Sequence, residues 1–287
     1  MCKNNYLVLG ASSNVATEFI LSFDKTKNNF YGLSTKPESR NSMFFNKVIS
    51  YKDYHQYSDI EFNNILVIAS RNPIQGGCLD DYLEVNSLVL NILNKIKYSQ
   101  SNKSKITFLS SFSVFDKNLT YLSDSTPLIP SDYYGESKIL LEEDLIDIST
   151  KFDADLLICR LPVFLYQGVD KASKNFLAKL LVAIKSKSRF TLTNPNSCLG
   201  AVFDVRNLAN LNSANTHKLK VVNCSAEPDI SFKQIADLAM LYGLEGVDWN
   251  LSDRPSIQIC TKTLRSILGY EPSAKKIIEQ WLAKELS

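Results

Sequence analysis

The fold of this chain is decided near its N-terminus, by the stretch Tyr6-Leu7-Val8-Leu9-Gly10-Ala11-Ser12-Ser13-Asn14-Val15-Ala16. The apolar run predicts a buried strand, Gly10 predicts a tight turn, and residues 15–23 predict a helix. In such a strand–turn–helix unit, backbone N–H groups and the positive end of the helix dipole face an anion such as a pyrophosphate. The stretch therefore predicts an α/β unit whose turn binds phosphate.

This turn departs from the three-glycine pattern that is usual for dinucleotide binding. Ser13 stands where the second glycine is expected and Ala16 where the third is expected, and a small residue at position 16 still allows close helix–strand contact. On its own, the motif is equally compatible with a turn that binds nothing. The residues that we expect to contact the cofactor here are Gly10, Ser12, Ser13, Asn14 and Val15.

Short apolar runs alternate with longer amphipathic segments through the first half of the chain. The predicted strands are 6–9, 29–33, 47–50, 64–69, 105–110 and 156–160, and the predicted helices are 15–23, 81–99 and 134–152. Apolar strands separated by helices form a parallel sheet that is covered on both faces. The pattern therefore predicts an α/β fold with a doubly wound parallel sheet, of the Rossmann type.

The pattern becomes less regular after about Pro162. Helices are predicted at 174–187, 231–242, 264–268 and 275–285, and strands near 201–205 and 218–223, with Ser231 as a helix N-cap. No linker or internal repeat separates the two halves. We expect a dinucleotide-binding domain over 1–163, to which a segment near 201–223 returns, and a smaller C-terminal α/β substrate lobe over 164–287.

Composition excludes several classes of function. The 287 residues are 45% hydrophobic, and 32 basic and 30 acidic residues give a net charge of +2, which favours neither nucleic acid nor a membrane surface as a partner. Six scattered cysteines without a C-x-x-C pair and only two histidines predict no metal site. Without a signal peptide or a membrane-spanning run, we expect a cytoplasmic protein with reduced thiols.

The end of the second predicted strand bears on the choice of cofactor. NAD sites usually carry an acidic residue there, whereas this chain has Ser34, Thr35 and Lys36, with Arg40 close behind. Hydroxyls and cations suit a 2′-phosphate, which a carboxylate would repel. This favours NADP(H), although NAD(H) is possible and a solvated polar turn would look the same.

A catalytic pattern follows the fifth strand. Ser111 follows the end of that strand, and Tyr134 and Lys138 then stand four residues apart at the start of a helix, so that they share one face. A phenol has an ordinary pKa near 10 and needs a neighbouring ammonium to work as an acid or base at neutral pH. Tyr-x-x-x-Lys pairs also occur by chance on solvated helices, and it is the order of the motifs that favours catalysis.

In this order the motifs resemble the extended short-chain dehydrogenases/reductases, in particular their sugar-nucleotide epimerase, dehydratase and reductase branch. The similar segments span nearly the whole chain: Val8–Ser12, Val67–Ser70, Asn86, Ser110–Phe115, Tyr134–Lys138, Cys159–Pro162, Val205–Ala209 and Leu268–Pro272. The family's aspartate in the seventh of these is replaced by Asn207.

The resemblance implies a role for individual residues. Tyr134 would be the acid/base, Lys138 would bind the nicotinamide ribose and lower the pKa of Tyr134, and Ser111 would orient the substrate oxygen. Ala69, Ser70, Asn86 and Pro162 would line the cofactor site, and Ser113 and Arg254 would contact a nucleotide-sugar substrate. The helices at 81–99 and 134–152 would form the contact of a possible homodimer.

The residues after Ser111 separate the family's reactions. Phe112 and Ser113 replace the acidic pair that dehydratases need, and neither histidine is near Tyr134 for a 3,5-epimerase. Reduction of a 4-keto-6-deoxysugar nucleotide by NADPH is favoured, because the basic end of the second strand suits a cofactor that is consumed. A sugar-nucleotide 4-epimerase and a non-catalytic NADP-binding sensor or scaffold remain alternatives.

Overall fold

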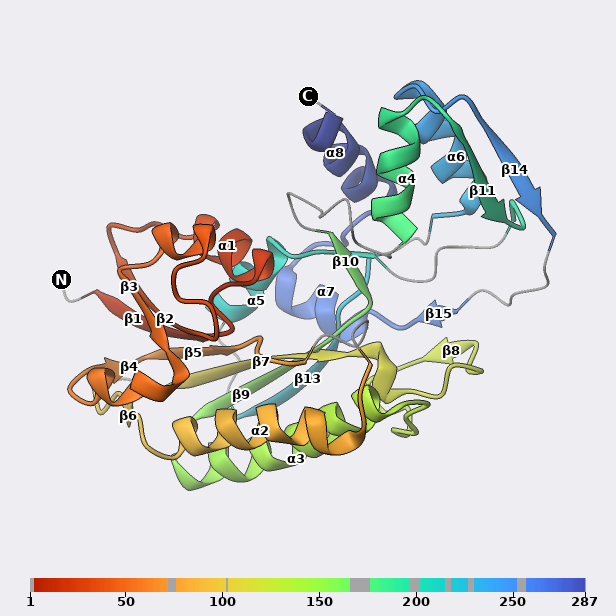
Figure 1. The fold of residues 1–287 in the computed structure, drawn as a ribbon. Coiled ribbons are helices and arrows are strands. Elements are labelled where there is room, and N and C mark those ends of the chain that lie inside the picture. Colours follow the sequence, from red (N-terminus) through yellow and green to blue (C-terminus); the bar gives the residue numbers. More distant parts are fainter. Residues whose placement is uncertain are drawn as a thin grey trace. The chain divides into compact units, whose positions relative to one another are not determined.

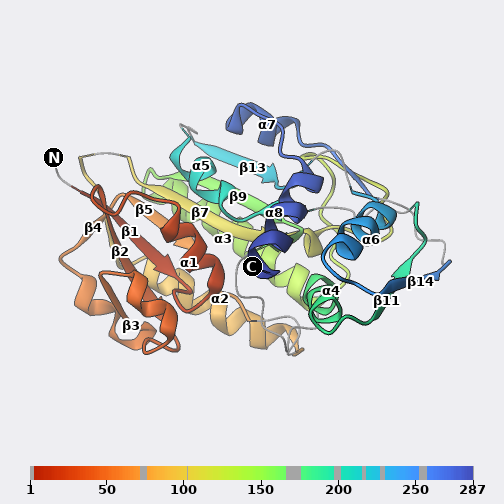
Figure 2. The same cartoon turned by 90° about the horizontal axis from the view of Figure 1, so that it is seen from above.

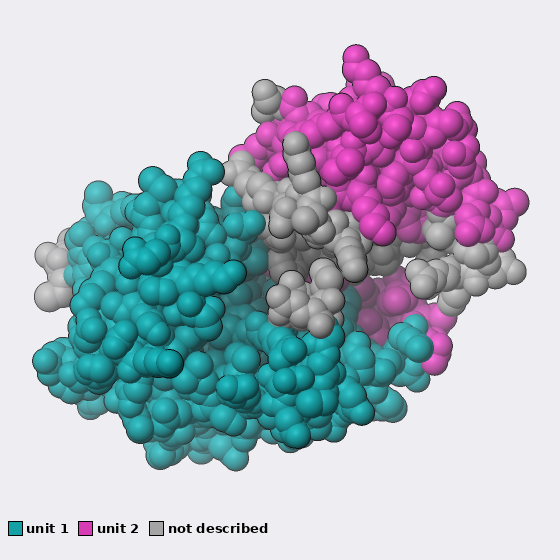
Figure 3. Space-filling model, viewed as in Figure 1, with its two compact units in different colours: residues 1–117, 126–161, 205–222 teal, residues 118–125, 162–204, 223–287 magenta. Residues whose placement is uncertain are grey.

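The structure is a computed structural model, and it describes residues 3–71, 76–101, 103–165, 176–196, 202–214, 218–226, 230–251 and 257–286. The chain divides into two compact units (Figure 3). Unit 1 comprises residues 1–117, 126–161 and 205–222, and unit 2 comprises residues 118–125, 162–204 and 223–287. Residues 118–125, which the sequence analysis left inside the dinucleotide-binding domain, group with unit 2.

Unit 1 is built on a seven-stranded sheet with the order β13-β9-β7-β5-β1-β2-β3 (Figure 1). The strands are β1 (Asn4–Leu9), β2 (Asn28–Ser34), β3 (Lys47–Ser50), β5 (Asn64–Val67), β7 (Lys105–Ser111), β9 (Asp155–Leu161) and β13 (Leu219–Asn223). The pairs from β3 to β9 are parallel. The strand order reverses between β1 and β5, and ligands bind at such a point in open α/β sheets. The predicted doubly wound fold is confirmed.

Helices cover both faces of this sheet (Figures 1 and 2). Helices α2 (Leu79–Leu93) and α3 (Tyr133–Lys151) lie side by side on one face, and α1 (Asn14–Leu21) and α5 (Asn207–Ser213) cover the other. Short 3-10 turns, η1 (Arg40–Phe44), η2 (Tyr51–Tyr57) and η4 (Phe112–Val114), follow β2, β3 and β7. Because successive strand residues point to opposite faces, strands this apolar need a helix layer on each side.

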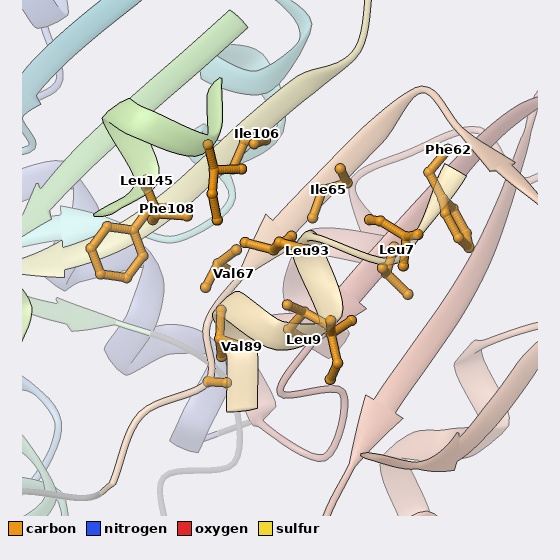
Figure 4. Close-up of a cluster of buried hydrophobic side chains, with 14 of the residues drawn as sticks. Leu7, Leu9, Phe62, Ile65, Val67, Val89, Leu93, Ile106, Phe108 and Leu145 are labelled. Carbon is orange, nitrogen blue, oxygen red and sulfur yellow. The ribbon is translucent and has the colours of Figure 1, made fainter. Parts of the chain in front are cut away.

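The main core of unit 1 fills the space between the sheet and helices α2 and α3 (Figure 4). Strand residues Leu9, Val67 and Phe108 are fully buried there against Val89 of α2 and Leu145 of α3. Each such side chain contributes about 1.5–3 kcal/mol through removal from water. This layer holds the middle of α3 against β7.

Side chains cap the helices that matter for the site. The carboxylate of Asp132 accepts a hydrogen bond from the Gly135 N–H at 2.7 Å and so begins α3. In unit 2, Ser231 and Gln234 form a capping box at α6 (Phe232–Leu241), which confirms the predicted N-cap.

The second helix ends earlier than the sequence predicts. Helix α2 stops at Leu93 instead of continuing to residue 99, and Lys97–Tyr98 forms strand β6, which pairs with β4 (Glu61–Phe62). The Asn94 side chain donates to the Leu90 carbonyl at 2.9 Å, and the Tyr98 hydroxyl donates to the Leu93 carbonyl at 2.9 Å. These side chains satisfy the last carbonyls of the helix, which favours its end there.

Unit 2 contains α4 (Phe176–Lys185), α6, α7 (Lys262–Leu268) and α8 (Ala274–Leu286). Apolar residues of α4, α6 and α8 pack together in a second core. Three parallel strand pairs, which the sequence analysis only partly foresaw, complete the unit: β10 (Val163–Leu165) with β12 (Val202–Asp204), β11 (Arg189–Thr193) with β14 (Gly246–Asn250), and β8 (Tyr121–Leu122) with β15 (Gln258–Ile259). No described helix is long and apolar enough to cross a membrane.

Candidate active site

The turn after β1 requires glycine. Gly10 has φ +101°, and both its N–H and that of Ala11 donate to the Leu33 carbonyl at 3.0 Å. A Cβ at position 10 would lie 3.0 Å from the Ala69 nitrogen, closer than side-chain atoms normally approach a backbone. Gly10 therefore lets the ends of β1, β2 and β5 meet at the point where the strand order reverses.

The start of α1 is fixed by its own side chains. Ser13 is the N-cap, and its hydroxyl accepts a hydrogen bond from the Ala16 N–H at 3.1 Å. From η1, the Asn41 amide donates to the Ser12 carbonyl at 2.8 Å and to Asn14 Oδ1 at 3.1 Å. The side chain of Val15 is buried, so only its backbone can contact a ligand. The serine that replaces a glycine here still forms an ordered helix N-terminus.

Two residues near this turn were not anticipated. The Asn41 side chain binds the Ser12 carbonyl in the turn after Gly10, and the buried Tyr51 hydroxyl hydrogen-bonds the Gly10 backbone. Burial raises the pKa of Tyr51, so this hydroxyl stays protonated. A polar side chain shortly after β2 and a tyrosine directly after β3 were visible in the sequence, but nothing in their spacing indicates these contacts.

The end of β2 carries exposed cations. Thr35, Lys36 and Arg40 are exposed, whereas Ser34 is buried and its hydroxyl accepts from the Lys36 N–H at 2.9 Å. The Ser34 hydroxyl thus stabilises the turn in this structure, whereas the side chains of Thr35, Lys36 and Arg40 are open to solvent.

Three residues predicted to line the cofactor site lie near α3: Ala69 and Ser70 follow β5, and Asn86 lies on α2. The N–H groups of Ile68 and Ala69 donate to the Leu9 carbonyl at 2.9 Å, which directs the next residue, Ser70, to the Tyr134 hydroxyl with which it hydrogen-bonds. Asn86 is buried and donates to the Ser137 carbonyl at 2.8 Å, which ties α2 to the first turn of α3.

The structure brings Ser111, Tyr134 and Lys138 together. The Tyr134 hydroxyl hydrogen-bonds the Ser111 side chain. Lys138 Nζ lies 5.6 Å from the centre of the Tyr134 ring and donates to the Leu109 carbonyl at 3.0 Å. Gly135 lies next to Tyr134 on α3. A Cβ at this position would overlap the Ser113 carbonyl oxygen, so glycine allows α3 to start this close to the segment after β7.

The charge state of this pair depends on its burial. Burial raises the pKa of Tyr134, and hydrogen bonds to Ser111 and Ser70 oppose that rise only in part. Burial also lowers the pKa of Lys138 to about 7, which the charge of Glu142 opposes. In this structure burial dominates the pKa of both groups, and the lowering of the Tyr134 pKa by Lys138 stays a prediction.

The remaining predicted residues are less informative. The Ser113 N–H donates to Ser111 Oγ at 3.1 Å, and Ser111 Oγ donates to Ser113 Oγ at 3.2 Å, so Ser113 orients the Ser111 side chain. Pro162 directly follows β9 and is partly buried, and Arg254 lies outside the described residues.

The residues of unit 1 fit a nicotinamide dinucleotide. Within the described part of the chain, Lys138 Nζ makes one hydrogen bond, although an ammonium can donate three. In its ammonium form, Lys138 therefore keeps two N–H groups that suit hydroxyls such as those of a ribose, and the N-terminus of α1 after Gly10 suits a pyrophosphate. Among the same residues, no cluster of histidine, cysteine, aspartate and glutamate could hold a metal ion.

Comparisons with known proteins give a consistent result for the fold. No protein-family model matches the chain, and no curated protein matches it in sequence. Solved structures do match it over nearly its full length. A UDP-glucuronic acid 4-epimerase from Bacillus cereus in complex with NAD matches with a TM-score of 0.79 at 13% identity, over 98% of this chain and 95% of that one.

Two further structures agree. The UDP-N-acetylglucosamine 4-epimerase from Methanobrevibacter ruminantium matches with a TM-score of 0.75 at 16% identity, over 100% of this chain and 98% of that one. The UDP-Glc/GlcNAc 4-epimerase from Campylobacter jejuni matches with a TM-score of 0.74 at 14% identity, over 98% and 99%. The chain thus has the fold of nucleotide-sugar 4-epimerases, and the resemblance to extended short-chain dehydrogenases/reductases is confirmed at the level of the fold.

Proposed function

We propose that this chain is an NAD(P)-dependent enzyme that oxidises and reduces a sugar carbon of a nucleotide-linked sugar, with 4-epimerisation as its reaction. The observation that carries the proposal is the hydrogen bond between Tyr134 and Ser111 at the end of β7, with the Lys138 ammonium behind the tyrosine ring. That edge of the sheet also holds the Gly10 turn and the N-terminus of α1.

Each residue has a defined task in this reaction. The Tyr134 hydroxyl exchanges a proton with the sugar hydroxyl, and Ser111 holds that oxygen in place. A bound nicotinamide would supply the hydride acceptor and donor for the sugar carbon. Lys138 would bind the ribose, and its protonated form would favour the phenolate that Tyr134 needs as a base.

Epimerisation takes first place over the reduction that the sequence analysis favoured. The three matching structures described above are named as 4-epimerases, and one of them is named as an NAD complex. An epimerase restores its cofactor in every cycle, so either NAD or NADP would serve. The exposed Lys36 and Arg40 support NADP(H), and the named complexes support NAD(H).

Reduction of a 4-keto sugar nucleotide is the second candidate, and one observation favours it. Burial keeps Tyr134 protonated, and a protonated phenol can donate a proton to a ketone oxygen without prior deprotonation. A reductase would also consume NADPH, which suits the cations at the end of β2.

One set of measurements separates these readings. The purified chain is tested for bound NAD or NADP and incubated with UDP-glucose, UDP-N-acetylglucosamine and UDP-glucuronic acid, and the C4 epimers are followed by NMR without added cofactor. NADPH oxidation is followed separately with 4-keto sugar nucleotides. Epimer formation supports the proposal, and stoichiometric NADPH oxidation supports the reductase.

Two variants test whether turnover depends on the Tyr134 hydroxyl. Tyr134→Phe removes the hydroxyl and should abolish turnover, whereas Tyr133→Phe changes its exposed neighbour on the same helix and should not. Cofactor binding without turnover on any of these substrates would refute the proposal that the chain is an enzyme. It would support the alternative of a non-catalytic dinucleotide-binding sensor. A chain that binds neither cofactor would refute both.

A further inference from the structure

A buried carboxylate lies one helical turn beyond Lys138. Glu142 is 3% exposed and accepts a hydrogen bond from the Ser110 hydroxyl. It also binds Arg160, which is 5% exposed, through two hydrogen bonds: Nε to Oε1 at 3.2 Å and Nη2 to Oε2 at 2.7 Å. Four residues along a helix place Lys138 and Glu142 on the same face. A planar guanidinium that grips a carboxylate in this way fixes its orientation as well as its position.

The contacts of Glu142 belong to the same strand end as the candidate catalytic residues. Consecutive residues of β7 bind one face of α3: the Leu109 carbonyl binds Lys138, Ser110 binds Glu142, and Ser111 binds the tyrosine hydroxyl. Ser110 and Arg160 are direct partners in the register of β7 and β9. Glu142 is therefore held by two adjacent strands, and α3 cannot slide or rotate on the sheet without breaking these bonds.

Lys138 depends on this arrangement for a counter-charge. It is buried, its Nζ lies 4.7 Å from the centre of the Phe108 ring, and Glu142 is the group whose charge favours its protonated form. The titratable or charged groups near Lys138 and Tyr134 on the packed elements are Tyr134 and Glu142 of α3, Asp132 before it, Arg160 of β9 and Tyr82 of α2. Arg160 compensates the charge of Glu142, so the two together set the field at Lys138.

We propose that Glu142, clamped by Ser110 and Arg160, is a positioning residue that fixes α3 on the ends of β7 and β9 one helical turn from Lys138 and supplies a counter-charge to the Lys138 ammonium. The inference deepens the proposed function and rests on it where Lys138 is taken to serve a cofactor. The clamp itself concerns residues of this chain alone. Removal of the Glu142 charge and removal of the Arg160 charge should each shift the titration midpoint of Lys138, and the two shifts should have opposite signs.

The test follows the Lys138 ammonium by NMR of the lysine-labelled chain without cofactor, with Lys138→Met to assign its signal. Glu142→Gln keeps the shape and removes the negative charge, so the titration midpoint should fall by about one pH unit. Arg160→Gln leaves the charge of Glu142 uncompensated, so the midpoint should rise by about one unit. In the double variant both charges are gone, and the midpoint should lie between those of the two single variants.

Two controls separate this role from a merely structural one. Ser149→Ala removes a buried hydroxyl of α3 that donates to the Ile146 carbonyl, so it should lower stability without moving the Lys138 midpoint. Ser110→Ala removes one donor from Glu142 and should raise the midpoint by less than Arg160→Gln does. It remains measurable if either charge variant fails to fold.

The outcomes are distinct. Midpoints that shift in the same direction in the two single variants, or that do not shift at all, would overturn the inference. The affinity for NADH or NADPH, measured across the same pH range, should follow the Lys138 midpoint in every variant. If Lys138 titrates as described and no dinucleotide binds, the proposed function fails and the clamp stands.

Discussion

Replacement of Gly10 by alanine should weaken both folding and cofactor binding. The φ of +101° is strained for any residue with a side chain, at a cost of about 1–3 kcal/mol. The new Cβ would also lie 3.0 Å from the Ala69 nitrogen and 3.2 Å from the Ile68 Cβ, and both belong to the segment after β5, which cannot move without breaking its bonds to Leu9. With this overpacking, we expect a loss of about 2–4 kcal/mol.

A second glycine provides a matched control. Gly243, after α6, has the same φ of +101°, but a Cβ there would meet nothing within 4 Å. Gly243→Ala therefore reports the backbone strain alone, and the difference between the two variants reports the close approach of the β1 and β5 segments. Both are measured by urea unfolding monitored through circular dichroism, and by titration with NADH and NADPH.

The expected result is that Gly10→Ala is the less stable variant and loses at least about tenfold in dinucleotide affinity, a change of about 1.4 kcal/mol. Gly243→Ala should bind dinucleotide as the unchanged chain does. Equal stability losses in the two variants would show that the contact with Ala69 costs nothing. Undiminished binding by Gly10→Ala would show that the turn does not bind the pyrophosphate.

Three further predictions concern the site. Tyr134→Phe should lower turnover by about 10²–10⁴-fold and leave NADH affinity within about twofold, as measured by steady-state kinetics and fluorescence titration; comparable turnover would exclude Tyr134 as the acid/base. Lys36→Ala combined with Arg40→Ala should weaken NADPH binding by about tenfold more than NADH binding, and equal losses would contradict a 2′-phosphate site at the end of β2. The pKa of Lys138 is about 7 in the folded chain, below the 10.5 of the unfolded chain. Between these pH values the unfolded chain holds a proton that the folded chain lacks. The contribution of Lys138 to the free energy of unfolding therefore rises with pH across this window. Urea unfolding of Lys138→Met at several pH values should show a smaller rise across that window, and an unchanged slope would mean that Lys138 is not desolvated as described.

Much of the fold could be predicted from the sequence because its signals are local. The strands of the central sheet are apolar runs, and their observed bounds differ from the predicted ones by one or two residues. The early end of α2 was missed because it depends on Asn94 and Tyr98, whose bonds to backbone carbonyls require the folded chain. The short strand pairs of unit 2 were missed for the same reason, since two or three residues carry no periodicity of their own.

The site was predictable in its parts and not in its electrostatics. The i, i+4 spacing placed Tyr134 and Lys138 on one face, but the depth of their burial, which raises the pKa of Tyr134, depends on packing against β7. A usable signal for the clamp existed: Glu142 stands four residues after Lys138, and Arg160 ends an otherwise apolar strand. Charged residues inside such runs are rarely buried without a partner of opposite charge, so the sequence could have predicted an ion pair between Glu142 and Arg160.

The passage of the chain back and forth between its units has a consequence for synthesis on the ribosome. The sheet of unit 1 is completed by residues 205–222, which supply α5 and β13, so that unit cannot close until most of the polypeptide has emerged. A truncated product ending near residue 163 would expose β9 as a bare edge. It would also leave the buried Lys105 without the carbonyls of residues 211, 212 and 214 that now bind its ammonium. Such a fragment should aggregate, and the two units of this protein are best expressed as one uninterrupted chain.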